Sequence, residues 1–136
     1  MKRLLAVGLA GLLIGAASLV ALDEKELTKK MKAAGEHMNG LRKSMGAGAM
    51  PDVAAHAKAM VSALEGTDSF WADRKNDEAV KWSKDGHTAA MALAKAAEAG
   101  DAAAARTASS AMGASCKSCH EKYREKLPDG TYRIKQ

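Results

Sequence analysis

Apolar residues follow a helical rather than a strand-like spacing along most of this 136-residue chain. Between Asp23 and Met45 they recur every three or four residues, which is the pattern of a helix with one buried face. The members of this face are Leu27, Met31, Ala34, Met38, Leu41 and Met45. The pattern predicts a first helix over residues 23–45.

Three more helices are predicted further along the chain. Pro51 suits the first turn of a second helix, which Gly66 interrupts. A third helix starts near Asn76, a good capping residue, and reaches about Ala99, and a fourth covers residues 101–127. The apolar face of the fourth helix is predicted to consist of Ala105, Ala108, Met112, Cys116, Cys119, Tyr123 and Leu127.

No stretch alternates apolar and polar residues in the manner of a strand. Residues 67–75, which include Phe70 and Trp71, are expected to form a connecting segment, and residues 131–136 a short tail. Four helices joined by short links favour an all-α fold, an antiparallel up-down-up-down four-helix bundle.

The N-terminus has the order of a secretory signal. Lys2 and Arg3 precede an uncharged apolar run that small residues close near Ala21. We therefore predict a cleaved signal peptide over residues 1–21, a domain over residues 22–136, a periplasmic location and no stable membrane association after cleavage. An uncleaved membrane anchor is the alternative, because the run is just long enough to span a bilayer.

The charge of the exported part is mildly basic. The whole chain has a net charge of +5, and without Lys2 and Arg3 there are 19 Lys and Arg against 16 Asp and Glu. A nucleic-acid-binding protein usually shows a stronger basic patch with stacking aromatic residues. We therefore expect no nucleic-acid partner.

Both cysteines lie in one short motif, Cys-x-x-Cys-His, formed by Cys116, Cys119 and His120. Two thiols at this spacing can add to the two vinyl groups of a haem, and the adjacent imidazole then becomes the proximal ligand of the iron. A structural zinc site is an alternative, but it needs a second pair of ligands. A redox dithiol is another, but it normally belongs to a strand-helix context.

The residues around the motif make the resemblance more specific. The stretch "CKSCHEKYREK", near the C-terminus of an exported helical chain, resembles the class II cytochromes c, which comprise the cytochromes c-prime and their low-spin relatives. In that pattern an aromatic and a basic residue follow the motif, here Tyr123 and Arg124. The resemblance implies one covalent haem c with its iron, and makes Arg124 a candidate contact for a haem propionate. The segment "FWADR" also resembles a tryptophan-containing link in the low-spin members.

The ligand on the other side of the iron decides the function. A sixth ligand gives a low-spin electron carrier, whereas an open site binds a small gas. The methionines of the first helix are candidates, although methionines at this spacing are more often core residues. In an antiparallel bundle, His120 lies roughly 10 Å from the end of the fourth helix and Met31 roughly 12 Å from the start of the first. Met38 would lie about 10 Å further along the axis.

The family comparison also indicates Met31. The stretch "KKMKAAGEHM" resembles the first helix of the low-spin members, in which an early methionine ligates the iron. The gas-binding branch tends to have an arginine one turn earlier, where this chain has Leu27. We therefore predict His120 and Met31 as axial ligands of a one-electron carrier. The alternative is a five-coordinate cytochrome c-prime that binds nitric oxide or carbon monoxide.

The remaining histidines are not expected to ligate the iron. His37 comes six residues after Met31 and so points to a different face of the helix. We expect His37 and His56 to be solvated surface residues, and the position of His87 depends on how the third helix is turned.

The net positive charge is concentrated beside the haem motif. Residues 22–115 carry 13 basic and 13 acidic side chains, whereas residues 116–136 carry six basic and three acidic ones. This charge could neutralise propionates or attract an acidic redox partner, although basic residues near a helix C-terminus also complement its dipole.

No acid-base pair or nucleophile accompanies the motif, so we predict no enzyme activity. The resemblance also implies a homodimer formed through the first two helices.

Overall fold

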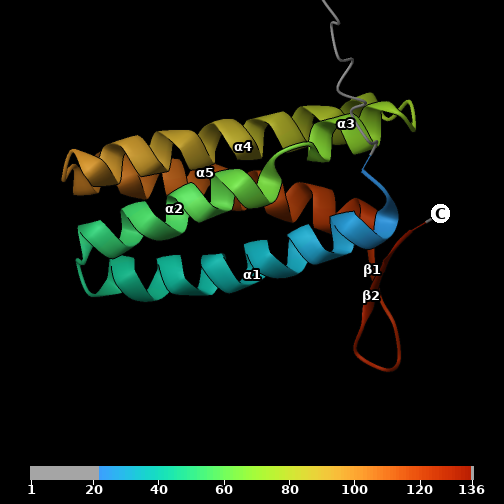
Figure 1. The fold of residues 1–136 in the computed structure, drawn as a ribbon, viewed down its shortest axis with the longest axis horizontal. Coiled ribbons are helices and arrows are strands. Elements are labelled where there is room, and N and C mark those ends of the chain that lie inside the picture. The colour runs from blue at the N-terminus through green and yellow to red at the C-terminus, as the bar shows by residue number, and fades with distance from the viewer. Residues whose placement is uncertain (1–21, 136) are drawn as a thin grey trace, which may run out of the picture.

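The computed structural model describes residues 22–135 as an antiparallel bundle of four long helices (Figure 1). The predicted signal peptide lies outside these residues. The long helices are α1 (Glu24–Gly46), α2 (Met50–Leu64), α4 (Asp77–Glu98) and α5 (Ala102–Tyr123). The start of α1 and the end of α5 lie at the same end of the bundle, so the predicted up-down-up-down fold is confirmed.

Local capping explains where three of the helices begin. The Asp23 carboxylate accepts a hydrogen bond of 2.7 Å from the backbone of Glu26, and the Asn76 side chain accepts one of 3.0 Å from Ala79. Asp101 accepts two such bonds at the start of α5. Each satisfies backbone N–H groups that have no partner within the helix. The capping residues in the sequence therefore mark these helix starts to within one residue.

The segment between α2 and α4 contains a short helix, α3 (Thr67–Ala72), where a connecting segment was expected. Gly66 ends α2 with a φ of 77°, a conformation that favours glycine. The Thr67 hydroxyl then donates a hydrogen bond of 2.8 Å to the Leu64 carbonyl. The turn of helix that follows buries Phe70 and Trp71. This burial stabilises a helix that is too short for its periodicity to be recognised.

The last helix ends earlier than predicted, at Tyr123 rather than near residue 127. Strand β1 (Arg124–Lys126) follows directly and pairs antiparallel with β2 (Tyr132–Ile134). The turn between them is closed by a bond from the Leu127 amide to the Thr131 carbonyl, and it passes through Gly130 at a φ of 84°. The prediction of no strands was therefore wrong here, because pairing with a segment beyond the turn overrides the helical periodicity.

The helices pack unequally. Judged by their backbones, α4 packs most extensively on α5 and next on α2, and α1 packs on α2. Within residues 22–135, α1 makes no comparably close approach to α5. No helix of the described chain has the length and apolarity needed to cross a membrane.

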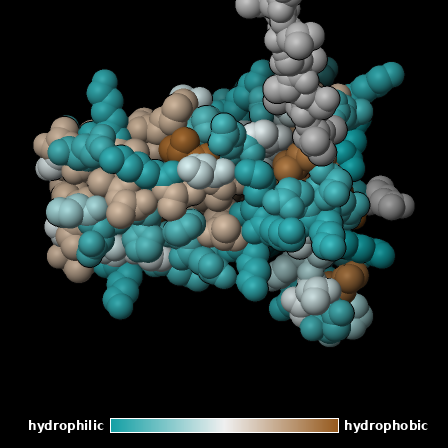
Figure 2. Space-filling view, in the orientation of Figure 1, coloured by the Kyte–Doolittle hydropathy of each residue, from teal (hydrophilic) through white to brown (hydrophobic). Residues whose placement is uncertain are grey.

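The apolar side chains form two clusters. The large cluster fills the bundle between α1, α2, α4 and α5, and its biggest fully buried members are Leu41, Val53, Met60, Leu93 and Met112. The small cluster lies near α3 and consists of Leu27, Phe70, Trp71 and Ala79. The molecular surface reflects this arrangement, because its alanine-rich end is mostly pale brown while the end with α3 and the hairpin is mostly teal (Figure 2).

Two residues of α4 test the importance of the large cluster. Leu93 is 0% exposed and Met91 is 46% exposed. We expect Leu93→Ala to lower the free energy of unfolding by about 2–5 kcal/mol, because it removes buried methyl groups and leaves a cavity. Met91→Ala, the control, should change it by less than about 0.5 kcal/mol. Guanidinium denaturation followed by circular dichroism measures both, and equal effects would contradict this assignment of the core.

Candidate haem site

The motif occupies the last two turns of α5. Cys116 and Cys119 are separated by three residues and therefore lie on neighbouring positions of one helix face, about 4.5 Å apart along the axis. Both are free thiols, and both are half-buried, as is His120. The sequence thus places two thiols and an imidazole together on the inner side of α5.

The two thiols lie at the boundary between the apolar clusters. Cys116 packs against the large cluster and Cys119 against the small one. Met31 packs against both, and among the partly buried hydrophobic residues that the structure describes no other does so. The structure therefore brings Met31 to the same boundary as the motif, whereas Met38 borders the large cluster alone.

The surroundings hold the three motif side chains in their neutral forms. Burial raises the pKa of Cys119 to about 11, and the negative charges of Cys116 and Glu78 act in the same direction. Burial also raises the pKa of Cys116. Burial, and secondarily the charge of Arg124, lowers the pKa of His120. A catalytic dithiol needs a lowered thiol pKa, so these shifts argue against that alternative, whereas a neutral imidazole is the form that ligates a metal.

Hydrogen bonds and an ion pair form a polar network that links the end of α5 to the start of α4. The Tyr123 hydroxyl lies 3.1 Å from a carboxylate oxygen of Glu78 and 3.2 Å from the Asn76 side-chain oxygen. The Lys122 ammonium forms an ion pair with the same Glu78 carboxylate. The hydrogen bond from Lys122 holds the pKa of Glu78 below its usual value. The sequence gives no direct signal for this network, because its members are 44 to 47 residues apart.

Aromatic rings surround the same end of the helix. The ring centroids of Trp71 and Tyr123 are 5.0 Å apart, and those of Phe70 and Trp71 are 5.1 Å apart in an edge-to-face arrangement. Trp82 lies 6.1 Å from Tyr123. The Arg74 guanidinium lies 3.6 Å from the centre of the Phe70 ring. The "FWADR" segment therefore supplies side chains that pack next to the motif.

Arg124 no longer belongs to the helix. It is the first residue of β1 and is exposed, and its guanidinium lies 4.3 Å from the centre of the Tyr132 ring. Its role as a propionate contact stays a prediction.

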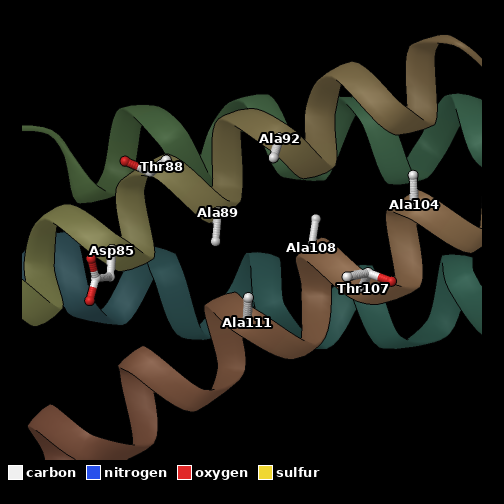
Figure 3. A pocket seen from close by; sticks show the side chains of 8 residues that line it. All are labelled: Asp85, Thr88, Ala89, Ala92, Ala104, Thr107, Ala108 and Ala111. Carbon is white, nitrogen blue, oxygen red and sulfur yellow. The ribbon is translucent and has the colours of Figure 1, made fainter.

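Two other features contribute nothing to this site. A shallow groove of about 530 Å³ runs between α4 and α5, and Figure 3 shows Ala89, Ala108 and Ala111 pointing into it. No residue of the Cys-x-x-Cys-His motif lines this groove.

Within residues 22–135, no three His, Cys, Asp or Glu side chains lie close enough together to hold a metal ion. A structural zinc site needs four such ligands, so the described residues do not supply them.

The fold and the motif together define a helical-bundle cytochrome of the c type. The chain belongs to the cytochrome c' family, whose model matches residues 24–124. Its structure is similar to that of cytochrome c' from Thermochromatium tepidum, with a TM-score of 0.59 and 23% sequence identity over 84% of this chain and 99% of the other. This second similarity shows a shared fold. No curated protein sequence matches the chain.

Proteins of this family carry one covalently attached haem c, and the motif fits that cofactor. Two unpaired thiols lie on neighbouring positions of one helix, and the imidazole that follows has a lowered pKa. Cys116 and Cys119 would hold the group through thioether bonds, and His120 would ligate its iron.

The polar network can be tested with two tyrosines. Tyr123→Phe removes the hydroxyl that bridges α4 and α5 and should lower the free energy of unfolding by about 0.5–1.5 kcal/mol. Tyr132 is 47% exposed, so Tyr132→Phe is the control and should have no measurable effect. Thermal and denaturant unfolding measure the difference. An equal loss in both variants would show that the network does not stabilise this end of α5.

The raised pKa of Cys119 predicts slow thiol chemistry in the folded chain before haem is attached. At pH 8 the thiolate fraction of Cys119 should be about 100-fold lower than that of a thiol of pKa 9.0. A thiolate of higher pKa is more nucleophilic, and this compensates for part of the loss. Alkylation of Cys119 should therefore be roughly tenfold slower. Iodoacetamide rates for Cys116→Ser should keep rising above pH 10. The same chain unfolded in guanidinium is the control, and its rate should be half-maximal near pH 9 and level off above that pH. The same midpoint in the folded chain would contradict the assignment.

Proposed function

We propose that this protein is a periplasmic one-electron carrier in which His120 and Met31 are the two axial ligands of a single haem c iron. The observation that carries the proposal is the position of Met31, which packs against both apolar clusters, one beside Cys116 and the other beside Cys119. Membership of the cytochrome c' family supports the coarser assignment as a mono-haem c-type cytochrome.

The direction of the helices supports Met31 over the other methionines. Met31 lies seven residues after the start of α1, roughly 10 Å, and His120 lies three residues before the end of α5, roughly 5 Å. Both helix ends are at the same end of the bundle (Figure 1). Met38 is about 10 Å further from that end, so it is the poorer candidate.

The side chains around the motif suit electron transfer. The bound haem supplies the redox couple, and a thioether ligand raises its reduction potential. A neutral thioether can remain a ligand in both oxidation states, so little has to rearrange. Leu27, Phe70 and Trp71 are buried beside Met31 and Cys119 and exclude water from this region. Leu27 also stands where the gas-binding branch tends to have an arginine.

An acidic redox partner would approach the end of α5 and the hairpin, where the excess of basic residues lies. Three of the six basic side chains are already in ion pairs within the chain: Lys117 with Glu121, Lys122 with Glu78, and Arg133 with Glu125. Beside these pairs, Arg124, Lys126 and Lys135 remain against only one further acidic residue of 116–136, Asp129, so the region stays net positive. We propose that the field of this net charge guides the partner.

We also propose that the protein is not an enzyme. A homodimer through α1 and α2 is part of the same proposal.

Gas binding is the second candidate function, and the comparisons favour it. The matched family and the matched solved structure are both described as cytochrome c'. In that case the iron would have His120 as its only protein ligand, and Met31 would be a core residue.

Optical spectra of the haem-loaded protein distinguish the two functions. We expect the oxidised protein to be low-spin, with the weak far-red band of sulfur-ligated ferric haem, and the reduced protein not to bind carbon monoxide readily. Met31→Ala should remove that band and open the iron to carbon monoxide. Met38→Ala is the matched control and should keep the spectrum of the unaltered protein. A high-spin spectrum that is unchanged by Met31→Ala would favour gas binding instead.

A further inference from the structure

His37 and His56 were expected to be separate, solvated histidines, and the structure contradicts this. His37 on α1 and His56 on α2 are both half-buried, and their Nδ1 atoms are 3.4 Å apart. The ring centroids are 5.7 Å apart and the ring planes are tilted by 51°. The two imidazoles therefore meet through their nitrogen atoms, and one ring donates a hydrogen bond to the other. The sequence gives no signal for this contact, because the two residues belong to different helices.

A glycine on α1 makes room for this pair. A Cβ atom at Gly40 would lie only 2.3–2.7 Å from three atoms of the His56 ring, which is too close for any side chain. Glycine in the middle of a helix is less favourable than alanine by roughly 1 kcal/mol. The His56 ring thus rests on the bare backbone of α1, beside His37, and its position depends on the absence of a side chain at residue 40.

The nitrogen separation is that of two ligands on one metal ion. Two nitrogens that are 2.0–2.1 Å from a tetrahedral zinc ion are about 3.3–3.4 Å apart. To use both Nδ1 atoms, the ring that donates the hydrogen bond has to carry its proton on Nε2 instead, which is the other neutral tautomer. Each ring then has to rotate so that both lone pairs aim at one point beside the line that joins the two nitrogens, by roughly 35° from a linear hydrogen bond for a tetrahedral ion. Imidazole is a preferred ligand of divalent copper, nickel and zinc.

We propose that His37 and His56 form a second metal site, which binds one divalent late first-row transition ion between α1 and α2. Within residues 22–135 no third His, Cys, Asp or Glu completes a metal-binding group, so water supplies the remaining ligands from the exposed side of the rings. The site is separate from the haem motif, because His37 lies six residues beyond Met31, about 9 Å along α1.

Isothermal titration of the tag-free, haem-loaded protein with zinc chloride tests the proposal. With the haem attached, Cys116, Cys119 and His120 do not compete for the ion. We expect one zinc ion per chain. His37→Gln and His56→Gln should each weaken binding at least tenfold, and Gly40→Ala should weaken it too although both histidines are present, because the new methyl group displaces the His56 ring.

The control is His87→Gln. His87 is also half-buried but belongs to α4, so this variant should bind zinc like the unaltered protein. Circular dichroism and the haem spectrum verify that each variant is folded. Binding that survives both His37→Gln and His56→Gln would overturn the proposal. One zinc ion per two chains, with dimer formation, would also overturn it, because it would mean that the ion bridges copies rather than the two helices of one chain.

Discussion

The close packing of α4 on α5 is the constraint on which the haem site depends. Both helices present alanines to each other, and small side chains let the two backbones approach closely along their length. The end of α5 is fastened to α4 a second time by Tyr123 and Lys122, which reach Glu78 and Asn76. Because α5 is held against α4, its two thiols face the boundary between the two apolar clusters. Within the described residues, the backbone of α1 makes no extensive contact with α5.

Most of the bundle was predictable because its signals are local. The side chains of Asp23, Asn76 and Asp101 cap helices through backbone groups two or three residues away, and the spacing of apolar residues marks the inner faces. The haem motif is equally local, since five consecutive residues carry it. These features need no knowledge of the tertiary structure.

The errors involve contacts that the spacing of apolar residues along the chain does not show. Leu127 continues the helical spacing, yet its amide bonds to Thr131 across a turn, and the hairpin replaces the last turn of helix. The Tyr123 network and the pair of His37 with His56 also join residues from different helices, which one sequence cannot align in space. The earlier end of α5 shifts the axial level of His120 by several ångströms. Met31 remains the proposed ligand, because its packing against both clusters does not depend on where α5 ends.

The position of Met31 is set by α1, and among the described helices α1 makes an extensive backbone contact only with α2. Buried Leu41 on α1 and Val53 on α2 belong to the large cluster and hold these two helices together. The His56 ring also packs on α1 at Gly40, about 13 Å along the helix from Met31. In the proposed six-coordinate haem, the distal ligand Met31 would therefore be supported by α2 and the proximal ligand His120 by α4. A change at the α1–α2 contact acts on Met31 without touching the motif, whereas a change at Glu78 or Asn76 acts on His120. The two proposed axial ligands would thus rest on separate parts of the bundle, and each could be altered by substitution while the other keeps its support.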